Sequence, residues 1–212
     1  MNKDNQSNTD ELDFVRKFVT DKMDSLQKDV KHCLQRPFAP MPAILWCVSC
    51  VDLLGALQAG QASDKADTSR NSRKYMKLFM GYTPEQIDLI LKVFRHKLVH
   101  LAQPGPLSSY KGKTVAWQYV HEYTPDHLAL QDCPDQVTVR PGWIVHVDQV
   151  FTLGITQFMQ DIRNSVFRTG GYLQKLETNT DILKRCKDAI QEIYTPQLIK
   201  DRSVTNSRVT KS

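Results

Sequence analysis

The sequence predicts a mainly α fold, an up-down helical bundle with a small antiparallel β insertion between its fourth and fifth helices. Apolar residues recur at steps of three and four over several segments, as they do in amphipathic helices. Clusters of proline and glycine separate these segments. Between them, one stretch alternates apolar and polar residues, which is the period of a half-buried strand.

The chain of 212 residues has the length of one domain, which we place at residues 8–199 with the β insertion at 111–147. The ends, 1–7 and 200–212, are polar, and we expect them to be disordered. The N-terminus lacks the apolar segment of a secretory signal, and the apolar run 43–57 is shorter than the ~20 residues of a membrane span. We therefore expect a cytoplasmic protein.

The composition excludes few classes of function. The net charge of +5 permits an RNA or phosphate partner but requires none. The five cysteines form no disulfide framework, which predicts reduced thiols. Cys47 and Cys50 form a CxxC pair inside a predicted helix, where two packed core thiols are a simpler interpretation than a redox or zinc site.

Helix boundaries follow from capping residues and breakers. Asn8 and Glu11 predict a capping box at the start of the first helix, which should end at Arg36 before three prolines. Thr83 and Gln86 predict a second capping box. The helices expected after the first span residues 43–59, 71–80 with Gly81 as C-cap, 84–102, 148–168, and 181–194 with Thr180 as a candidate cap.

The helix predicted at 84–102 carries apolar or histidine side chains on two faces. At about 100° per residue, one face holds Ile87, Leu91, Phe94, Leu98 and Leu101, and the opposite face holds Leu89, Val93, His96 and His100. Such a helix is fully buried, or it buries one face in the protomer and the other against a partner. Arg95 falls between the two faces.

The segment VFRHKLVHL at 93–101 resembles the signature of the HEPN superfamily (higher eukaryotes and prokaryotes nucleotide-binding). That signature is an Arg, often followed by a polar residue, and then a His on the same bundle helix. Arg95, His96 and His100 match it in order. The layout is similar too, with a long first helix and an apolar second helix that carries one acidic residue, Asp52. The β insertion lies outside the resemblance.

The resemblance implies a metal-independent endoribonuclease that acts as a dimer, in a toxin–antitoxin or phage-defence setting. His100 would be the general base toward an RNA 2′-hydroxyl, and Arg95 would hold the phosphate. The product would be a 2′,3′-cyclic phosphate, and no cofactor is implied. Because Arg95 and His100 are about 140° apart on an ideal helix, we expect the Leu89, Val93, His96 and His100 face to pair two protomers.

Asp52 is the expected supporting acid, with His96 beside the motif. An unpaired carboxylate in an apolar helix is costly, so Asp52 should pair with Arg95 or orient a histidine. The alternative is that it faces solvent at a helix edge. A second alternative makes Arg95 and His100 a structural pair in a non-catalytic HEPN-like scaffold that binds nucleotide, RNA or protein. Metal binding by His96 and His100 would need a third ligand, and Lys97 opposes a cation.

Basic and aromatic residues have two interpretations each. Arg73, Lys74, Lys77 and Lys97 are the expected RNA-binding residues, and Arg70, Lys92, Lys111 and Lys113 extend this set; the alternative is a solvated surface. Trp117, Tyr119 and Trp143 stack bases or, as we favour, pack the sheet against the bundle. His121, His127 and His146 have the pattern of ordinary strand or loop residues.

Overall fold

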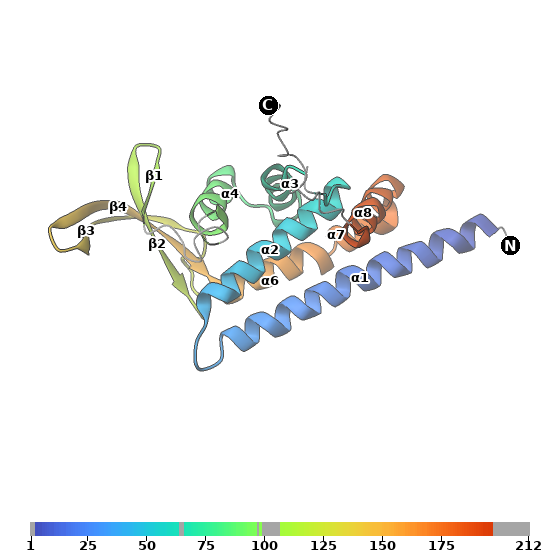
Figure 1. Cartoon of the computed structure of the whole chain (residues 1–212), viewed down its shortest axis with the longest axis horizontal. Coiled ribbons are helices and arrows are strands. Elements are labelled where there is room, and N and C mark those ends of the chain that lie inside the picture. Colours follow the sequence, from blue (N-terminus) through green and yellow to red (C-terminus); the bar gives the residue numbers. More distant parts are fainter. Residues whose placement is uncertain (1–2, 64–65, 97, 99–106, 197–212) are drawn as a thin grey trace, which may run out of the picture.

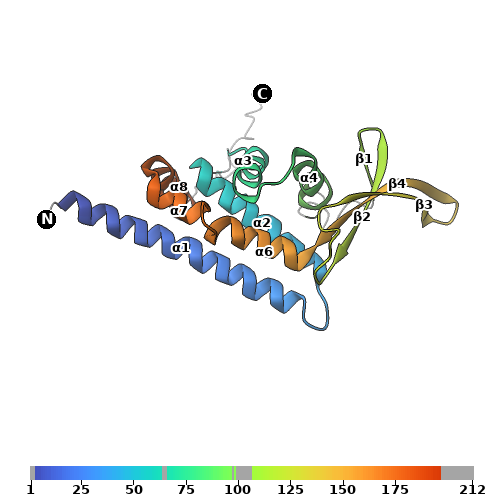
Figure 2. The same ribbon diagram turned by 180° about the vertical axis from the view of Figure 1, so that it is seen from behind.

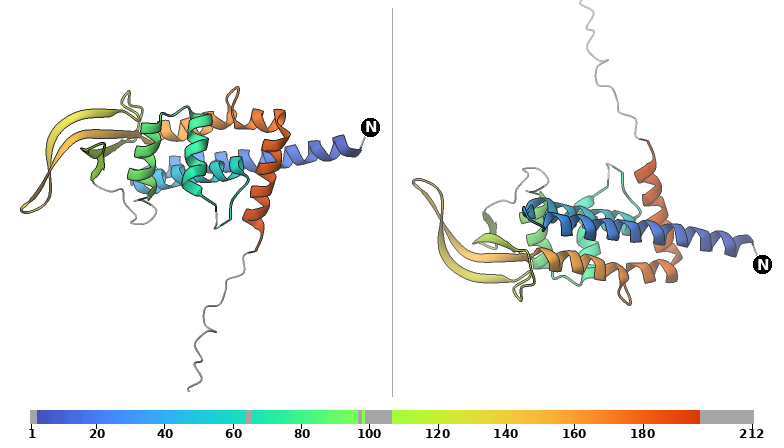
Figure 3. Two further views of the ribbon diagram at one scale, coloured as in Figure 1. Left: turned by 90° about the horizontal axis from the view of Figure 1, so that it is seen from above. Right: turned by 90° about the horizontal axis from the view of Figure 1, so that it is seen from below.

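A computed structural model of the protein describes residues 3–63, 66–96, 98 and 107–196. The helices α1 (Lys3–Cys33), α2 (Pro40–Ala59) and α6 (Ile155–Phe167) lie along one axis of the molecule (Figure 1). The helices α3 (Thr68–Tyr75), α4 (Pro84–Leu89) and α8 (Thr180–Tyr194) run across this axis, as the view from above in Figure 3 shows. α7 (Tyr172–Thr178) connects α6 to α8. The prediction of a mainly helical fold is confirmed.

Two of the crosswise helices end in π-helical turns, which the periodicity did not predict. α3 continues as η1 (Met76–Met80), and α4 continues as η2 (Ile90–Arg95). The predicted capping box of α4 is present, with Thr83 and Gln86 each satisfying the other's backbone N–H. Gly81 closes η1 in the left-handed conformation, at a φ of 71°, as its position predicted.

The sheet has four strands in the order β1-β2-β4-β3 and is mixed rather than antiparallel. β2 and β4 are parallel, with Val115 opposite Gln149 and Val120 opposite Gly154, whereas β1–β2 and β3–β4 are antiparallel. Beyond Gln149, toward the turn, β4 pairs with β3 alone, and this ribbon projects away from the bundle (Figure 2). The strands are β1 (Leu107–Tyr110), β2 (Lys113–Val120), β3 (Leu130–Arg140) and β4 (Trp143–Gly154).

Several predicted boundaries were wrong. The segment 148–154 is the end of β4 and not the start of a helix, and α6 begins at Ile155. α1 already begins at Lys3, so Asn8 lies inside it and does not cap it. Asn179 caps α8 by accepting from the Ile182 N–H, in place of Thr180. α7 was not predicted, and the expected C-terminal tail at 200–212 lies outside the described residues.

The predicted core stripe is confirmed at its described positions, because Ile87, Leu91, Phe94 and Leu98 are all buried. Leu101, the last residue of the stripe, lies outside the described residues. The second face differs from the prediction. Leu89 and Val93 are also buried, at 1 % and 0 % exposure within a single protomer, so they cannot meet another protomer. His96 is exposed. The helix therefore buries most of its circumference in its own bundle.

Aromatic side chains join η2 to the sheet. The Phe94 ring lies edge-on to Trp117, with centroids 5.9 Å apart, and Trp117 stacks with Tyr119 at 6.1 Å. Both β2 residues are partly buried against the core, which confirms the packing interpretation for them. Trp143 differs, because it is 52 % exposed near the tip of the β3–β4 ribbon.

α2 is longer than predicted and is the one described helix apolar enough to span a membrane by length and composition, with a mean hydropathy of 1.7. It packs against α1, α3, α6 and α8. Core helices of soluble proteins meet the same criterion, so this feature assigns no membrane.

Candidate functional site

The expected partner of Asp52 is Arg95. The guanidinium Nε of Arg95 donates to both carboxylate oxygens, at 3.0 Å to Oδ1 and 2.9 Å to Oδ2. The two side chains are only 16 % and 21 % exposed, so little solvent screens the pair. The prediction that Asp52 pairs with Arg95 is confirmed, and the alternative of a solvated helix edge is wrong.

Two serines of α3 complete the cluster. The Oγ of Ser69 accepts from Arg95 Nη1 at 2.9 Å, and the Oγ of Ser72 lies 2.5 Å from Asp52 Oδ1, to which it donates. Neither serine is among the residues predicted from the sequence. Their spacing of three places them on one helix face, and Ser72 is fully buried, so a polar stripe on a bundle helix was the available signal.

Gly55 explains how α3 comes close enough to supply these serines. A Cβ at Gly55 would lie 2.8 Å from the Asn71 carbonyl carbon and 2.8 Å from the Ser72 nitrogen. Only glycine permits the two backbones to approach so closely. Because Asp52 lies one turn before Gly55 on α2, the crossing brings Ser72 to the carboxylate.

The π-helical turn η2 ends at Arg95. The next residue, His96, donates its backbone N–H to the Leu91 carbonyl, five residues back. This wider turn changes the direction of Arg95 relative to an ideal α-helix, and π turns occur frequently at functional sites. His100 and Lys97, two of the predicted site residues, lie outside the described part of the chain.

Several of the predicted RNA-binding cations form ion pairs with carboxylates. Arg73 of α3 forms a salt bridge with Asp88 of α4 at 2.5 Å, which connects the two helices. Lys111 pairs with Glu85 at 3.0 Å, and Lys113 pairs with Asp132 at 3.3 Å. Lys74 and Lys77 are exposed. Among the described residues, no ion pair is formed by Arg70, Lys74 or Lys77. The Nζ of Lys92 lies over the Tyr110 ring, 5.4 Å from its centroid.

Asp52 also borders a pocket of about 210 Å³, between α2, the following loop and α8. Glu192 of α8 holds this loop, because its Oε2 accepts from the backbone N–H groups of Ala62 and Ser63 at 2.6 and 2.8 Å. The carboxylate partner of Arg95 therefore lies at the wall of this pocket.

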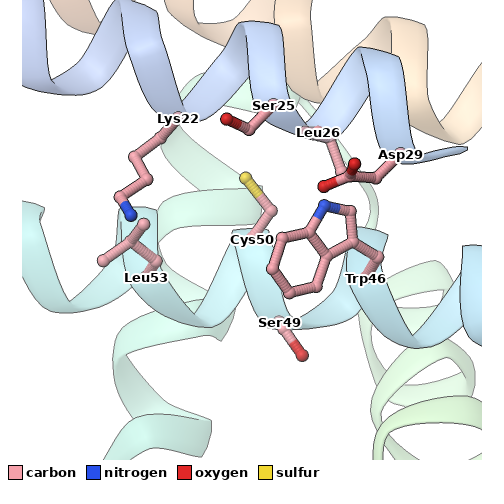
Figure 4. Close-up of a pocket in the computed structure, with 8 residues that line it drawn as sticks. All are labelled: Lys22, Ser25, Leu26, Asp29, Trp46, Ser49, Cys50 and Leu53. Carbon is pink, nitrogen blue, oxygen red and sulfur yellow. The ribbon is translucent and has the colours of Figure 1, made fainter.

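A separate pocket of about 290 Å³ lies between α1 and α2 (Figure 4). Lys22, Cys50 and Trp46 lie around it, and none of the predicted site residues lines it. Burial raises the pKa of the Cys50 thiol to about 12, against the opposing charge of Lys22. Burial also raises the pKa of Cys47. Both members of the CxxC pair are buried, so they are core thiols.

His127 belongs to a second polar cluster, which was not predicted from the sequence. Its Nδ1 accepts from the Gly154 N–H at 3.0 Å, which leaves the proton on Nε2, 3.3 Å from Asp161 Oδ2. The buried hydroxyl of Tyr82 donates to the same oxygen at 2.7 Å. These bonds tie the sheet to α6 and to the loop before α4, which gives His127 a structural role.

Within the described residues, no group of three or more His, Cys, Asp or Glu side chains is arranged to hold a metal ion. Comparisons of the chain with family models, curated proteins and solved structures found no match. A function is therefore inferred from the residues and their geometry.

Proposed function

We propose that the chain is a HEPN-like, cytoplasmic endoribonuclease that needs no metal ion. The observation that carries the proposal is the pair between Asp52 and Arg95, at 2.9 and 3.0 Å. An acidic residue of the second helix beside the motif arginine is the arrangement that the family resemblance implies. The π turn that ends at Arg95 adds a second irregularity at the same place.

In the proposed reaction, His100 takes the proton of an RNA 2′-hydroxyl. The O2′–P bond forms, the P–O5′ bond breaks, and the 5′-oxygen gains a proton. Arg95 stabilises the charge on the phosphate. Asp52 and Ser69 hold its Nε and Nη1, and no described residue accepts from Nη2, which is left for a phosphate oxygen. A fixed guanidinium loses little entropy when it binds.

The proposal includes a homodimer, because the family mechanism joins two motifs across a cleft. Leu89 and Val93 are buried in the protomer, so of the four residues first assigned to the interface, His96 is the described one at the surface. A dimer contact near the motif would therefore include His96.

A second function has its own support. Asp52 neutralises Arg95, and Asp52 and Ser69 occupy two of its three nitrogens. Arg95 is also largely shielded from solvent. These are properties of a structural pair, and they favour a non-catalytic HEPN-like scaffold that binds RNA, nucleotide or a protein partner.

Cleavage of RNA in EDTA separates the two functions. For an enzyme, we expect wild-type protein to cleave single-stranded RNA, and His100→Ala to reduce the rate by at least 10²-fold, the usual contribution of a general base. Arg95→Lys keeps the charge but loses the planar fork, and should also be slow. Lys184→Gln, an exposed change on α8, is the matched control and should cleave normally. Intact RNA with wild-type protein, over a wide range of substrates, would favour the scaffold.

A further inference from the structure

Three basic side chains converge on a pocket that is distinct from the Arg95 cluster. The pocket, of about 260 Å³, lies where the end of α2 meets α3 and α8. Arg70 and Lys74 line it from α3, and Arg185 lines it from α8. Asp67 is the one carboxylate among its lining residues, so the lining carries more positive than negative charge.

Arg185 is held in place before any ligand binds. Its Nε donates to the Gln58 carbonyl at 3.1 Å. The stem of the side chain packs on Gly60, where an added Cβ would lie 3.0 Å from the Arg185 Cβ. Gly60 is the C-cap of α2 and has a φ of 76°, a left-handed conformation that favours glycine. The close contact with Arg185 is a second reason for glycine at this position. An ordered guanidinium of this kind suits bidentate binding of an oxyanion.

The charges at this pocket lack partners. No described residue forms an ion pair with Arg70, Lys74 or Arg185. Arg70 and Lys74 are also one turn apart on α3, a spacing at which like charges repel. A bound anion would remove this repulsion, so the arrangement favours occupancy by a negatively charged group.

Two buried amides in the pocket wall add a second, independent observation. Gln58 and Asn71 are 4 % and 7 % exposed, and in the described structure Gln58 Oε1 accepts no hydrogen bond and Asn71 Nδ2 donates none. Unsatisfied buried polar atoms are rare and costly. One needs a donor and the other an acceptor, so a complementary ligand carries both.

We propose that this pocket binds a phosphomonoester, with the phosphate between Arg70, Lys74 and Arg185 and a neighbouring hydroxyl, which can both donate and accept, toward the Gln58 and Asn71 amides. Lys74 then serves this pocket and not the Arg95 cluster. The phosphate belongs either to a small sugar phosphate or to the 5′ end of an RNA, which share this chemistry. The proposal does not depend on catalysis by Arg95 and His100.

The test is isothermal titration of the full chain with ribose 5-phosphate, with ionic strength held constant because exposed charges are screened by salt. We expect saturable 1:1 binding that Arg185→Gln and Arg70→Gln each weaken at least tenfold, a change of about 1.4 kcal/mol. Lys184→Gln, a matched charge removal one residue away on α8, should bind within about twofold of wild type. Arg70 is exposed, so its variant keeps the test valid if Arg185→Gln fails to fold.

Three results would overturn the proposal. They are the absence of saturation up to about 10 mM, equal weakening by Lys184→Gln, and binding of ribose 5-phosphate no tighter than that of inorganic phosphate or sulfate. A comparison of 5′-phosphorylated with 5′-hydroxyl RNA identifies the source: tighter, Arg185-dependent binding of the former supports an RNA end, and equal binding supports a small sugar phosphate. RNA cleavage by Arg185→Gln at the wild-type rate would separate this pocket from the Arg95 site.

Discussion

Asp52 is a carboxylate in the middle of an apolar helix, and its neighbours supply the charge and the hydrogen bonds that it needs there. Arg95 approaches from η2, and Ser72 approaches from α3. The pair is largely screened from solvent, so removing one partner leaves the other charge partly buried and unpaired. Its contribution to stability should therefore exceed that of an ordinary surface ion pair, which is about 0–1 kcal/mol.

A double-mutant cycle measures this coupling. We expect Asp52→Asn and Arg95→Gln each to lower the free energy of unfolding by about 2 kcal/mol, the scale of a hydrogen bond to a charged group. The double variant should lose about as much as either single variant. Asp188→Asn, an exposed aspartate on α8, should stay within about 0.5 kcal/mol of wild type. Additive losses in urea unfolding would show that the two residues do not interact.

The buried thiol of Cys50 makes the free energy of unfolding depend on pH in the alkaline range. Burial raises its pKa from 9.0 to about 12, so the folded state holds the thiol proton more tightly than the unfolded state. This stabilisation is fully present below pH 9 and is lost as the pH rises toward 12. Cys50→Ala should therefore lose less stability over this pH range than wild type. Cys133→Ala, at a half-buried strand position, is the control and should follow the wild-type curve.

At the scale of elements, the crossing of α2 and α3 at Gly55 determines the site. The close approach of the two backbones places Ser69 and Ser72 beside the pair of Asp52 and Arg95. The salt bridge between Arg73 and Asp88 then connects α3 to α4. The site is therefore sensitive to any change that separates the helices.

Gly55→Ala tests this dependence. Alanine favours a helix over glycine by about 1 kcal/mol, but its Cβ would meet the α3 backbone at 2.8 Å. We expect overpacking to dominate, with a net loss of about 1–2 kcal/mol in urea unfolding. Ser49→Ala introduces alanine on the same helix without this contact, and should be near neutral. An equal or higher stability of Gly55→Ala would contradict the close crossing.

Helices with a clear apolar period were predictable from the sequence. Segments whose structure depends on pairing with a strand distant in the sequence were not. Ile87, Leu91 and Phe94 follow a helical period and are buried as expected. The segment 148–154 holds apolar residues at both helical and strand spacing, so its local pattern does not decide between the two. Pairing with β2 decides it, because that pairing extends to Gly154.

At the scale of the whole molecule, the cost of burying a charged group predicted part of the site from the sequence. The cost of an unpaired carboxylate predicted that Asp52 has a partner, and the motif predicted Arg95. For the serines, the spacing of three on one helix face was the available signal. The apolar period gave no signal for the π turn, and the pocket around Arg185 depends on how α3 and α8 dock against α2. The second face of the helix predicted at 84–102 was misassigned for the same reason, because its own bundle covers Leu89 and Val93.

The central claim is that the cluster of Arg95 and Asp52 belongs to an enzyme that uses the RNA 2′-hydroxyl as nucleophile. The most direct measurement is cleavage, in EDTA, of an RNA oligomer against the same oligomer with one 2′-deoxy nucleotide at the cleaved position, with mass analysis of the ends. The proposal predicts 2′,3′-cyclic phosphate and 5′-hydroxyl ends from the first and no cleavage at that position in the second. Cleavage of both oligomers at equal rates, or 3′-hydroxyl and 5′-phosphate ends, would contradict it.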